Sequence, residues 1–106
     1  MANAPAAGGA LVLDQVFNYP NPFPRETFLH ARVNQPARLK IQILTVAGRR
    51  VWETQIDGKA GENYIPWNGR DSVGEKVAIG VYLFKVTAES PSGAKASSIG
   101  RALLTQ

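Results

Sequence analysis

The side chains that could support catalysis are few and widely scattered. The chain has 106 residues, one histidine and no cysteine, so a thiolate nucleophile, a disulfide and a thiolate metal site are all excluded. A hydrolytic triad would have to combine His30 with a serine and an aspartate, and no spacing in the sequence favours that combination. We therefore interpret His30 as a structural residue on the face of a strand. The candidate aspartates are Asp14, Asp57 and Asp71.

The glutamates do not form the carboxylate pair that glycosidic hydrolysis requires. That chemistry needs two carboxyl groups that converge in a cleft, whereas these glutamates fall in or beside loops, or on polar faces of strands. The sequence therefore predicts a protein that is not an enzyme and that needs no cofactor. The glutamates are Glu26, Glu53, Glu62, Glu75 and Glu89.

A calcium site is the main inorganic alternative. Asn68, Asp71 and Glu75 lie in one glycine-containing loop and offer the oxygen ligands that calcium prefers. However, Arg70 and Lys76 place positive charge among them. In the structural alternative, Asn68 adopts a positive φ angle and Asp71 accepts backbone N–H groups in an Asx turn. We favour this alternative and expect no bound metal.

Exposed aromatic rings could instead stack on sugars, as they do in carbohydrate-binding modules. Trp52 and Tyr64 are the candidates for such a glycan site. Core packing explains most of the aromatic residues better, because each ring buries a large area. We expect Trp67 and Tyr82 to lie inside the domain and Phe23 to close one end of the core.

The net charge of +4 raises the question of nucleic-acid binding. The 12 basic residues are scattered, however, and the longest basic run is the pair Arg49-Arg50. Solvated strand faces explain most of this distribution, so we expect no nucleic-acid partner. The alternative is a weak attraction to an anionic polysaccharide or to an acidic partner surface. No apolar run approaches the roughly 20 residues of a membrane-spanning helix, so we expect no membrane insertion.

Short extended segments, separated by turns, must position these side chains. Apolar and polar residues alternate within the segments, and turns such as Ala47-Gly48-Arg49 separate them. Pro20, Pro22 and Pro24 exclude a helix early in the chain and predict a stiff extended stretch there. The expected segments are 11–13, 16–19, 27–33, 38–46, 51–56, 63–67, 81–88 and 95–104.

This density of strands predicts an all-β fold. About seven strands in about 90 residues is typical of an immunoglobulin-like antiparallel β-sandwich. We expect residues 11–106 to form this one domain. Residues 1–10 are rich in alanine, glycine and proline, and we expect them to form a flexible leader or linker.

Three motifs carry a resemblance to a known family. They are Tyr-Pro-Asn-Pro-Phe near the start, a Gly-Arg hairpin turn in the middle, and a Trp-Asn-Gly-Arg-Asp stretch that leads through glycines to Val-Tyr. The chain resembles the immunoglobulin-like modules at the C-termini of secreted bacterial proteins. These include the type IX secretion sorting domains and the similar domain of the flagellar hook-capping protein. The matching positions are Tyr19, Pro20, Asn21, Pro22, Phe23, Gly48, Arg49, Trp67, Gly69, Asp71, Gly74, Gly80 and Tyr82.

The chain also departs from the family pattern. Pro24-Arg25 replaces a second Asn-Pro, Thr45 replaces an aspartate before the hairpin turn, and Asn68 replaces an aspartate after the tryptophan. Thr27 corresponds to a threonine of the family. The matching positions are turn, core or edge residues and none is catalytic, so the resemblance implies a module that delivers, attaches or assembles.

The resemblance implies two alternative functions. A sorting domain would be read by the outer-membrane secretion machinery and then removed or exchanged for a lipopolysaccharide anchor. Its location would be secreted or at the cell surface, reached through the periplasm. A hook-cap-like module would instead contact neighbouring subunits of an extracellular assembly. The Tyr19–Phe23 motif and the end of the chain soon after Leu104 favour the sorting type.

The final strand, residues 95–104, is the expected recognition surface. An exposed terminal strand can pair with the edge of a receptor's sheet. Residues 101–106 would then be needed for export but not for most of the fold. The expected contact residues are Lys95, Arg101, Leu103 and Leu104.

Overall fold

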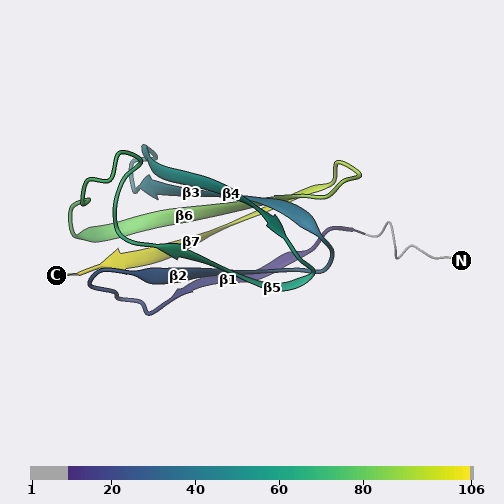
Figure 1. Cartoon of the computed structure of the whole chain (residues 1–106), viewed down its shortest axis with the longest axis horizontal. Coiled ribbons are helices and arrows are strands. Elements are labelled where there is room, and N and C mark those ends of the chain that lie inside the picture. The colour runs from purple at the N-terminus through teal and green to yellow at the C-terminus, as the bar shows by residue number, and fades with distance from the viewer. Residues whose placement is uncertain (1–9, 106) are drawn as a thin grey trace, which may run out of the picture.

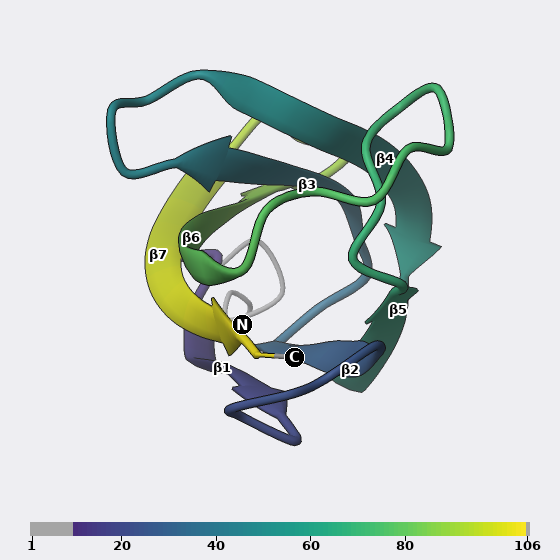
Figure 2. The same cartoon turned by 90° about the vertical axis from the view of Figure 1, so that its left-hand side faces the viewer.

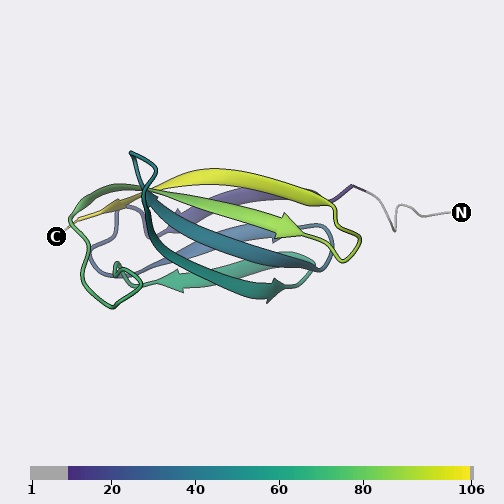
Figure 3. The same ribbon diagram turned by 90° about the horizontal axis from the view of Figure 1, so that it is seen from above.

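The computed structural model describes residues 10–105, so most of the expected leader, residues 1–9, lies outside the described part. Seven strands form two antiparallel sheets that stack face to face (Figure 1 and Figure 3). One sheet has the order β1-β2-β5 and the other the order β4-β3-β6-β7. The all-β, immunoglobulin-like sandwich is therefore confirmed. The strands are β1 (Leu13–Tyr19), β2 (Thr27–Val33), β3 (Ala37–Thr45), β4 (Arg50–Gly58), β5 (Gly61–Trp67), β6 (Gly80–Glu89) and β7 (Lys95–Leu104).

The ends of the strands lie close to the predicted residues, but two predicted segments form a single strand. Strands β2 and β7 begin and end at the predicted residues. The two short segments predicted at 11–13 and 16–19 are instead one strand, β1, whose register with β2 shifts between Asp14 and Phe17. Gln15 lies in this bulge with a φ of 50°. The bulge lets β1 continue past the irregular stretch that separated the two segments in the sequence. Among residues 10–105, no helix could cross a membrane.

The proline-rich stretch after β1 is not extended, contrary to the prediction. Residues 20–25 bend back toward the last strand, and Phe23 forms an isolated bridge with Leu104 of β7. Proline does exclude a helix here, but it does not by itself fix the direction of the chain. Contacts with β7, remote in sequence, decide the path of this segment.

The core lies between the two sheets and is built from alternate residues of the strands. Leu29, Ala31 and Val33 of β2 face inward, as the alternation predicted, and are 0–1% exposed. On β6, the predicted inward residues Tyr82, Phe84, Val86 and Ala88 are all buried. Each large apolar side chain buried in this way contributes about 1.5–3 kcal/mol. The sandwich is therefore held together by its core, since the chain has no disulfide.

A glycine on β7 allows the last strand to pack closely on this core. Gly100 lies opposite Phe84 in the β6–β7 pairing. A Cβ atom added to Gly100 would overlap the Phe84 ring, with Cε1 and Cε2 of that ring at 2.7 and 2.9 Å. Glycine inside a strand often marks such a close approach.

Three aromatic rings pack together where β5 ends and β6 begins. Figure 2 shows this end of the sandwich from the front. Trp67 packs edge-on against both Phe23 and Tyr82, with ring centroids 5.7 Å apart in each pair. All three are buried, as predicted. The hydroxyl of Tyr82 donates to the carbonyl of Ala78 at 2.5 Å, and burial raises the pKa of that hydroxyl.

Candidate functional site

His30 is buried against the outer face of the three-stranded sheet, not in a cleft. The rings of Phe17 and Tyr64 flank it on the neighbouring strands, with centroids at 4.4 and 4.8 Å. Nδ1 lies 2.8 Å from the Gln15 carbonyl oxygen, and Nε2 lies 3.2 Å from Oε1 of Glu62. These partners are a backbone carbonyl and a glutamate, not the serine and aspartate of a triad. The geometry therefore agrees with the structural interpretation.

The Glu62 carboxylate completes this cluster. The Tyr64 hydroxyl donates to Oε1 of Glu62 at 2.7 Å, and the same oxygen is the one near His30. The hydrogen bonds from Tyr64 and then from His30 lower the pKa of Glu62 below its ordinary value of 4.5. The carboxylate in turn raises the pKa of the Tyr64 hydroxyl. Glu62 is thus held ionised near neutral pH, which suits a contact between β2 and β5 better than proton transfer.

The loop between β5 and β6 uses its polar residues to hold its own backbone. Oδ1 of Asp71 accepts hydrogen bonds from the N–H groups of Val73 and Glu75, at 3.0 and 2.9 Å. The predicted Asx-type role of Asp71 is therefore confirmed. The prediction for Asn68 was wrong, because it is Gly69 that has the positive φ, 72°. Glycine meets that requirement without a side-chain penalty, which leaves Asn68 Oδ1 to accept from the Arg70 N–H.

These contacts use two of the oxygens that a calcium ion would need, Oδ1 of Asp71 and Oδ1 of Asn68. The Asp71 oxygen that accepts both N–H groups would have to give up a hydrogen bond in order to bind a cation. Within residues 10–105, no group of three or more histidine, aspartate or glutamate side chains is arranged to hold a metal.

The exposed rings lie on a different surface from the one expected. Trp52, one of the two predicted glycan-site residues, lies opposite Ile43 and is half-buried against the core. Tyr64, the other, is 60% exposed. Phe17, Tyr19 and Phe28 lie on the same outer sheet face and are 45–74% exposed. Most aromatic residues were expected in the core, although the alternation in β2 already places Phe28 on the face opposite Leu29.

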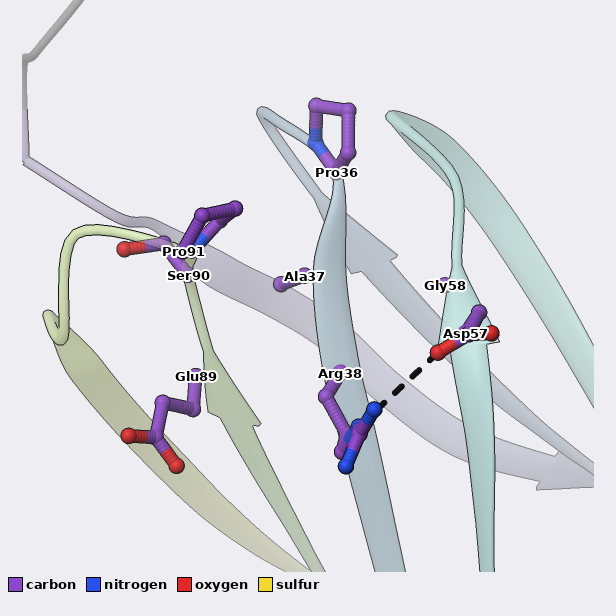
Figure 4. A pocket seen from close by; sticks show the side chains of 8 residues that line it. All are labelled: Pro36, Ala37, Arg38, Asp57, Gly58, Glu89, Ser90 and Pro91. Atoms are coloured by element: carbon purple, nitrogen blue, oxygen red, sulfur yellow. Dashed lines mark ion pairs between the residues drawn. The ribbon is translucent and has the colours of Figure 1, made fainter.

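A hollow at the other end of the sandwich carries charged side chains but no reactive arrangement. Its lining comes from β3, β4 and the β6–β7 turn (Figure 4). The guanidinium of Arg38 points toward the carboxylate of Asp57, with Nε 3.8 Å from Oδ1 (Figure 4). Both side chains are largely exposed, and exposed ion pairs contribute little to stability. The lining residues are Pro36, Ala37, Arg38, Asp57, Gly58, Glu89, Ser90 and Pro91.

The Tyr19–Phe23 motif binds the end of the last strand. Asn21 Nδ2 donates to the carbonyl of Arg101 at 3.1 Å, and the Leu103 N–H donates to Asn21 Oδ1 at 2.9 Å. The Phe23 N–H donates to the Leu103 carbonyl at 2.9 Å, and the Thr105 N–H donates to the Phe23 carbonyl at 2.8 Å. The Asn21–Phe23 segment therefore occupies the edge of β7 over residues 101–105, much as a neighbouring strand would.

Buried polar contacts hold this segment in place from the other side. Thr27, which corresponds to the threonine of the family motif, is fully buried. Its hydroxyl donates to the carbonyl of Pro20 at 2.8 Å and accepts from Nδ2 of Asn18 at 3.1 Å. Phe23 is 0% exposed. One residue of the motif thus enters the core while another, Asn21, binds the last strand.

The predicted recognition residues divide into surface and core positions. Lys95, Arg101 and Leu103 point outward from β7, and Leu103 is 37% exposed. Leu104 is only 6% exposed and belongs to the core, so its prediction as a contact residue was wrong. Strand alternation is the reason, because consecutive residues 103 and 104 face opposite sides of the sheet.

The structure also corrects two expectations about the last strand as a whole. The backbone edge over residues 101–105 is already occupied by Asn21 and Phe23, and β1 lies beside β7 (Figure 2 and Figure 3). A receptor strand could therefore pair at residues 101–105 only by displacing native contacts. Deleting residues 101–106 would remove Ala102 and Leu104 from the core, so that stretch is not dispensable for the fold.

Comparisons with known proteins agree on the fold. The structure superimposes on part of dimeric latent PorU from Porphyromonas gingivalis with a TM-score of 0.77, at 20% identity over 92% of this chain and 10% of PorU. It superimposes on FlgD from Xanthomonas campestris with a TM-score of 0.67, at 20% identity over 92% of this chain and 71% of that one. Truncated FlgD from Helicobacter pylori gives a TM-score of 0.62, at 21% identity, over 95% and 77% of the two chains.

These structural likenesses establish the fold alone, because the identities are low. The chain spans only about a tenth of PorU. No curated protein matches the sequence closely enough to count as a relative. The sequence model of the FlgD Ig-like domain, by contrast, matches residues 29–92, from within β2 to within the turn after β6. The chain belongs to the FlgD Ig-like domain family.

Proposed function

We propose that this domain is a non-catalytic module that directs an exported bacterial protein to the cell exterior or anchors it at the cell surface. One observation carries the proposal: the Tyr19–Phe23 motif and the last strand are bound to each other by four hydrogen bonds. Both are parts of the chain that resemble type IX sorting domains. A motif that fixes the last strand would present a defined surface to the secretion machinery.

The chemistry of the described residues supports a role without catalysis. The His30 ring nitrogens lie near Gln15 and Glu62, and Asp71 serves the backbone of its own loop. His30 and Asp71 were two of the candidates for a reactive site. An outer-membrane secretion complex is the partner that this function requires, and transit through the periplasm is the corresponding route.

An assembly module is the second candidate, and family membership favours it. The chain belongs to the FlgD Ig-like domain family, and FlgD of Xanthomonas campestris is described as a hook-capping protein essential for flagellar assembly. In this alternative the domain would contact neighbouring subunits outside the cell. Concentration-dependent association of the purified chain would support it, and a monomer at all concentrations would count against it.

Glycan binding is a third candidate, and the aromatic surface around Tyr64 favours it. Exposed rings of Phe17, Tyr19, Phe28 and Tyr64 share one sheet face, and such rings can stack on sugars. Titration with neutral polysaccharides, followed by NMR of the aromatic side chains, would test it. Unchanged ring signals would remove this candidate.

The sorting proposal can be tested with a fusion protein. The whole 106-residue chain is placed after a reporter with an ordinary export signal, in a bacterium that has type IX secretion. The reporter is then measured in the medium, on the surface and in the periplasm. We expect it outside the cell, with the domain removed or exchanged. Retention in the periplasm with the domain intact would refute sorting and favour the assembly module.

A further inference from the structure

The outer face of β6 and β7 is available for contact although the backbone edge of β7 is not. Outward-facing residues of the two strands lie opposite each other in three successive pairs. These pairs are Val81 with Leu103, Leu83 with Arg101, and Lys85 with Ile99. We call these six residues the β6–β7 patch. Their neighbours Tyr82, Phe84 and Ala102 face the core, so the patch is the solvent side of a well-packed part of the sheet.

The patch exposes apolar surface at three points. Val81 is 44% exposed, Leu103 is 37% exposed and Ile99 is 58% exposed. Single exposed apolar residues need no explanation, but several in successive cross-strand pairs on one face of the sheet form a shared surface. A soluble domain gains nothing from such a surface unless a partner covers it, so the patch is a candidate interface.

The charges of the patch are positive and have no ionic partner within the described residues. The ion pairs of the described chain are His30–Glu62, Arg38–Asp57 and Arg50–Glu53. None of them includes Lys85 or Arg101. The nearest acid of β6, Glu89, lies at the far end of the strand, opposite Lys95. The two basic side chains therefore remain available to an acidic partner.

We propose that the β6–β7 patch is a docking surface for a protein face that carries both acidic and apolar side chains, which under the proposed function belongs to a component of the secretion machinery. This inference rests on that proposed function. Charge complementarity would bring Lys85 and Arg101 against carboxylates of the partner. Ile99 lies on one side of Arg101, and Leu103, paired with Val81, lies on the other, so these three side chains would bury apolar surface beside the charges.

The composition of the patch distinguishes this partner from two others. An anionic polysaccharide would engage the basic residues but would leave the exposed valine, isoleucine and leucine uncovered. A second copy that docked patch to patch would bring Lys85 and Arg101 near the same cations of its partner, which is unfavourable. An acidic protein satisfies both the charges and the apolar residues.

Two double variants of the full-length reporter fusion separate these contributions. Lys85→Glu with Arg101→Glu reverses the charge of the patch, and Ile99→Thr with Leu103→Thr reduces its apolar surface while placing residues that suit a strand at both positions. The matched control, Arg49→Glu with Lys59→Glu, makes the same change in net charge at exposed turn positions. Thermal unfolding of each purified chain verifies that it is folded. Gln replaces Glu at positions 85 and 101 if the charge reversal unfolds the domain.

Three measurements decide the outcome: export of each fusion, heparin binding and self-association of the purified chains. We expect each patch variant to reduce export by about tenfold or more, because both classes of contact contribute to an interface, and the control to be exported like the unaltered fusion. Normal export of folded patch variants would overturn the proposal. The proposal would also be overturned if the charge variant, but not the apolar variant, lost both heparin binding and export, since that result indicates a polysaccharide partner. Self-association that the patch variants abolish would overturn it in favour of a second copy. If the unaltered fusion stays in the periplasm, the proposed function fails, and this inference fails with it.

Discussion

The Leu103 N–H donates a hydrogen bond to Oδ1 of Asn21 at 2.9 Å, although 82 residues separate the two in the sequence. The same amide side chain donates back to the carbonyl of Arg101. Asn21 thus offers β7 one acceptor and one donor, as the backbone of a neighbouring strand would. The first motif of the chain is in this way a structural part of its last strand.

Replacing Asn21 by alanine should loosen the end of β7. We expect a loss of about 1–2 kcal/mol in the free energy of unfolding, because two hydrogen bonds are lost. The Leu103 amide should also exchange its hydrogen faster with solvent. Hydrogen exchange followed by NMR measures both effects. Asn68→Ala, which removes a local acceptor in another loop, should leave Leu103 unchanged. Equal protection of Leu103 in the wild type and in Asn21→Ala would show that Asn21 does not hold the strand.

Replacing Gly100 by alanine should destabilise the domain through a steric clash. The new methyl group would overlap the Phe84 ring, and overpacking of a core usually costs about 1–3 kcal/mol. Thermal or chemical unfolding measures this loss. The double variant Gly100→Ala with Phe84→Leu should lose less stability than the sum of the two single variants, since the smaller side chain makes room. Additive losses would mean that the clash is relieved elsewhere.

Replacing Asp71 by alanine should destabilise the β5–β6 loop. The carboxylate accepts two backbone N–H groups, so we expect a loss of about 1–2 kcal/mol. Asp71→Asn retains an oxygen acceptor and should lose less. Unfolding curves measured with and without millimolar calcium provide the comparison. A calcium-dependent rise in stability that disappears in Asp71→Asn would contradict the structural role.

The stability contribution of Glu62 should depend on pH in the acidic range. Its pKa in the folded protein lies below the ordinary 4.5, so its contribution is present above the ordinary value and is lost as the pH falls through the lower folded-state pKa. Tyr64→Phe removes the hydrogen bond that lowers the pKa of Glu62 most, so that pKa should rise. NMR titration of the Glu62 carboxyl carbon measures it, with Tyr19→Phe as the control. An unchanged pKa in Tyr64→Phe would contradict the assigned cause.

The fold was predictable because alternation in single strands carries the necessary information. The inward faces of β2 and β6 could be assigned from the order of their residues alone, since successive side chains face opposite sides. Phe23, Trp67 and Tyr82 were predicted to be buried, and the structure confirms this. The same rule should have excluded Leu104 from the surface once Leu103 was placed there.

Contacts between distant segments could not be read from the sequence. The pairing of Asn21 with Leu103 depends on which strands neighbour each other after folding, and no local pattern encodes it. The burial of His30 depends likewise on rings from β1 and β5. The sequence does indicate close packing at Gly100, because an isolated glycine in an alternating strand is typical of it. It does not identify Phe84 as the side chain that packs there. The β6–β7 patch could not be predicted from the sequence, because its residue pairs depend on the register between the two strands.

The most direct measurement of a sorting role is the accessibility of a fused reporter to protease added to intact cells. One culture carries the reporter followed by the whole chain, and the other carries the reporter alone with the same export signal. If the domain directs its cargo outward, protease removes the surface-bound reporter of the fusion, or the medium already contains it, while the reporter alone stays protected in the periplasm. Equal protection of the two reporters in cells with a working type IX system would contradict the sorting function.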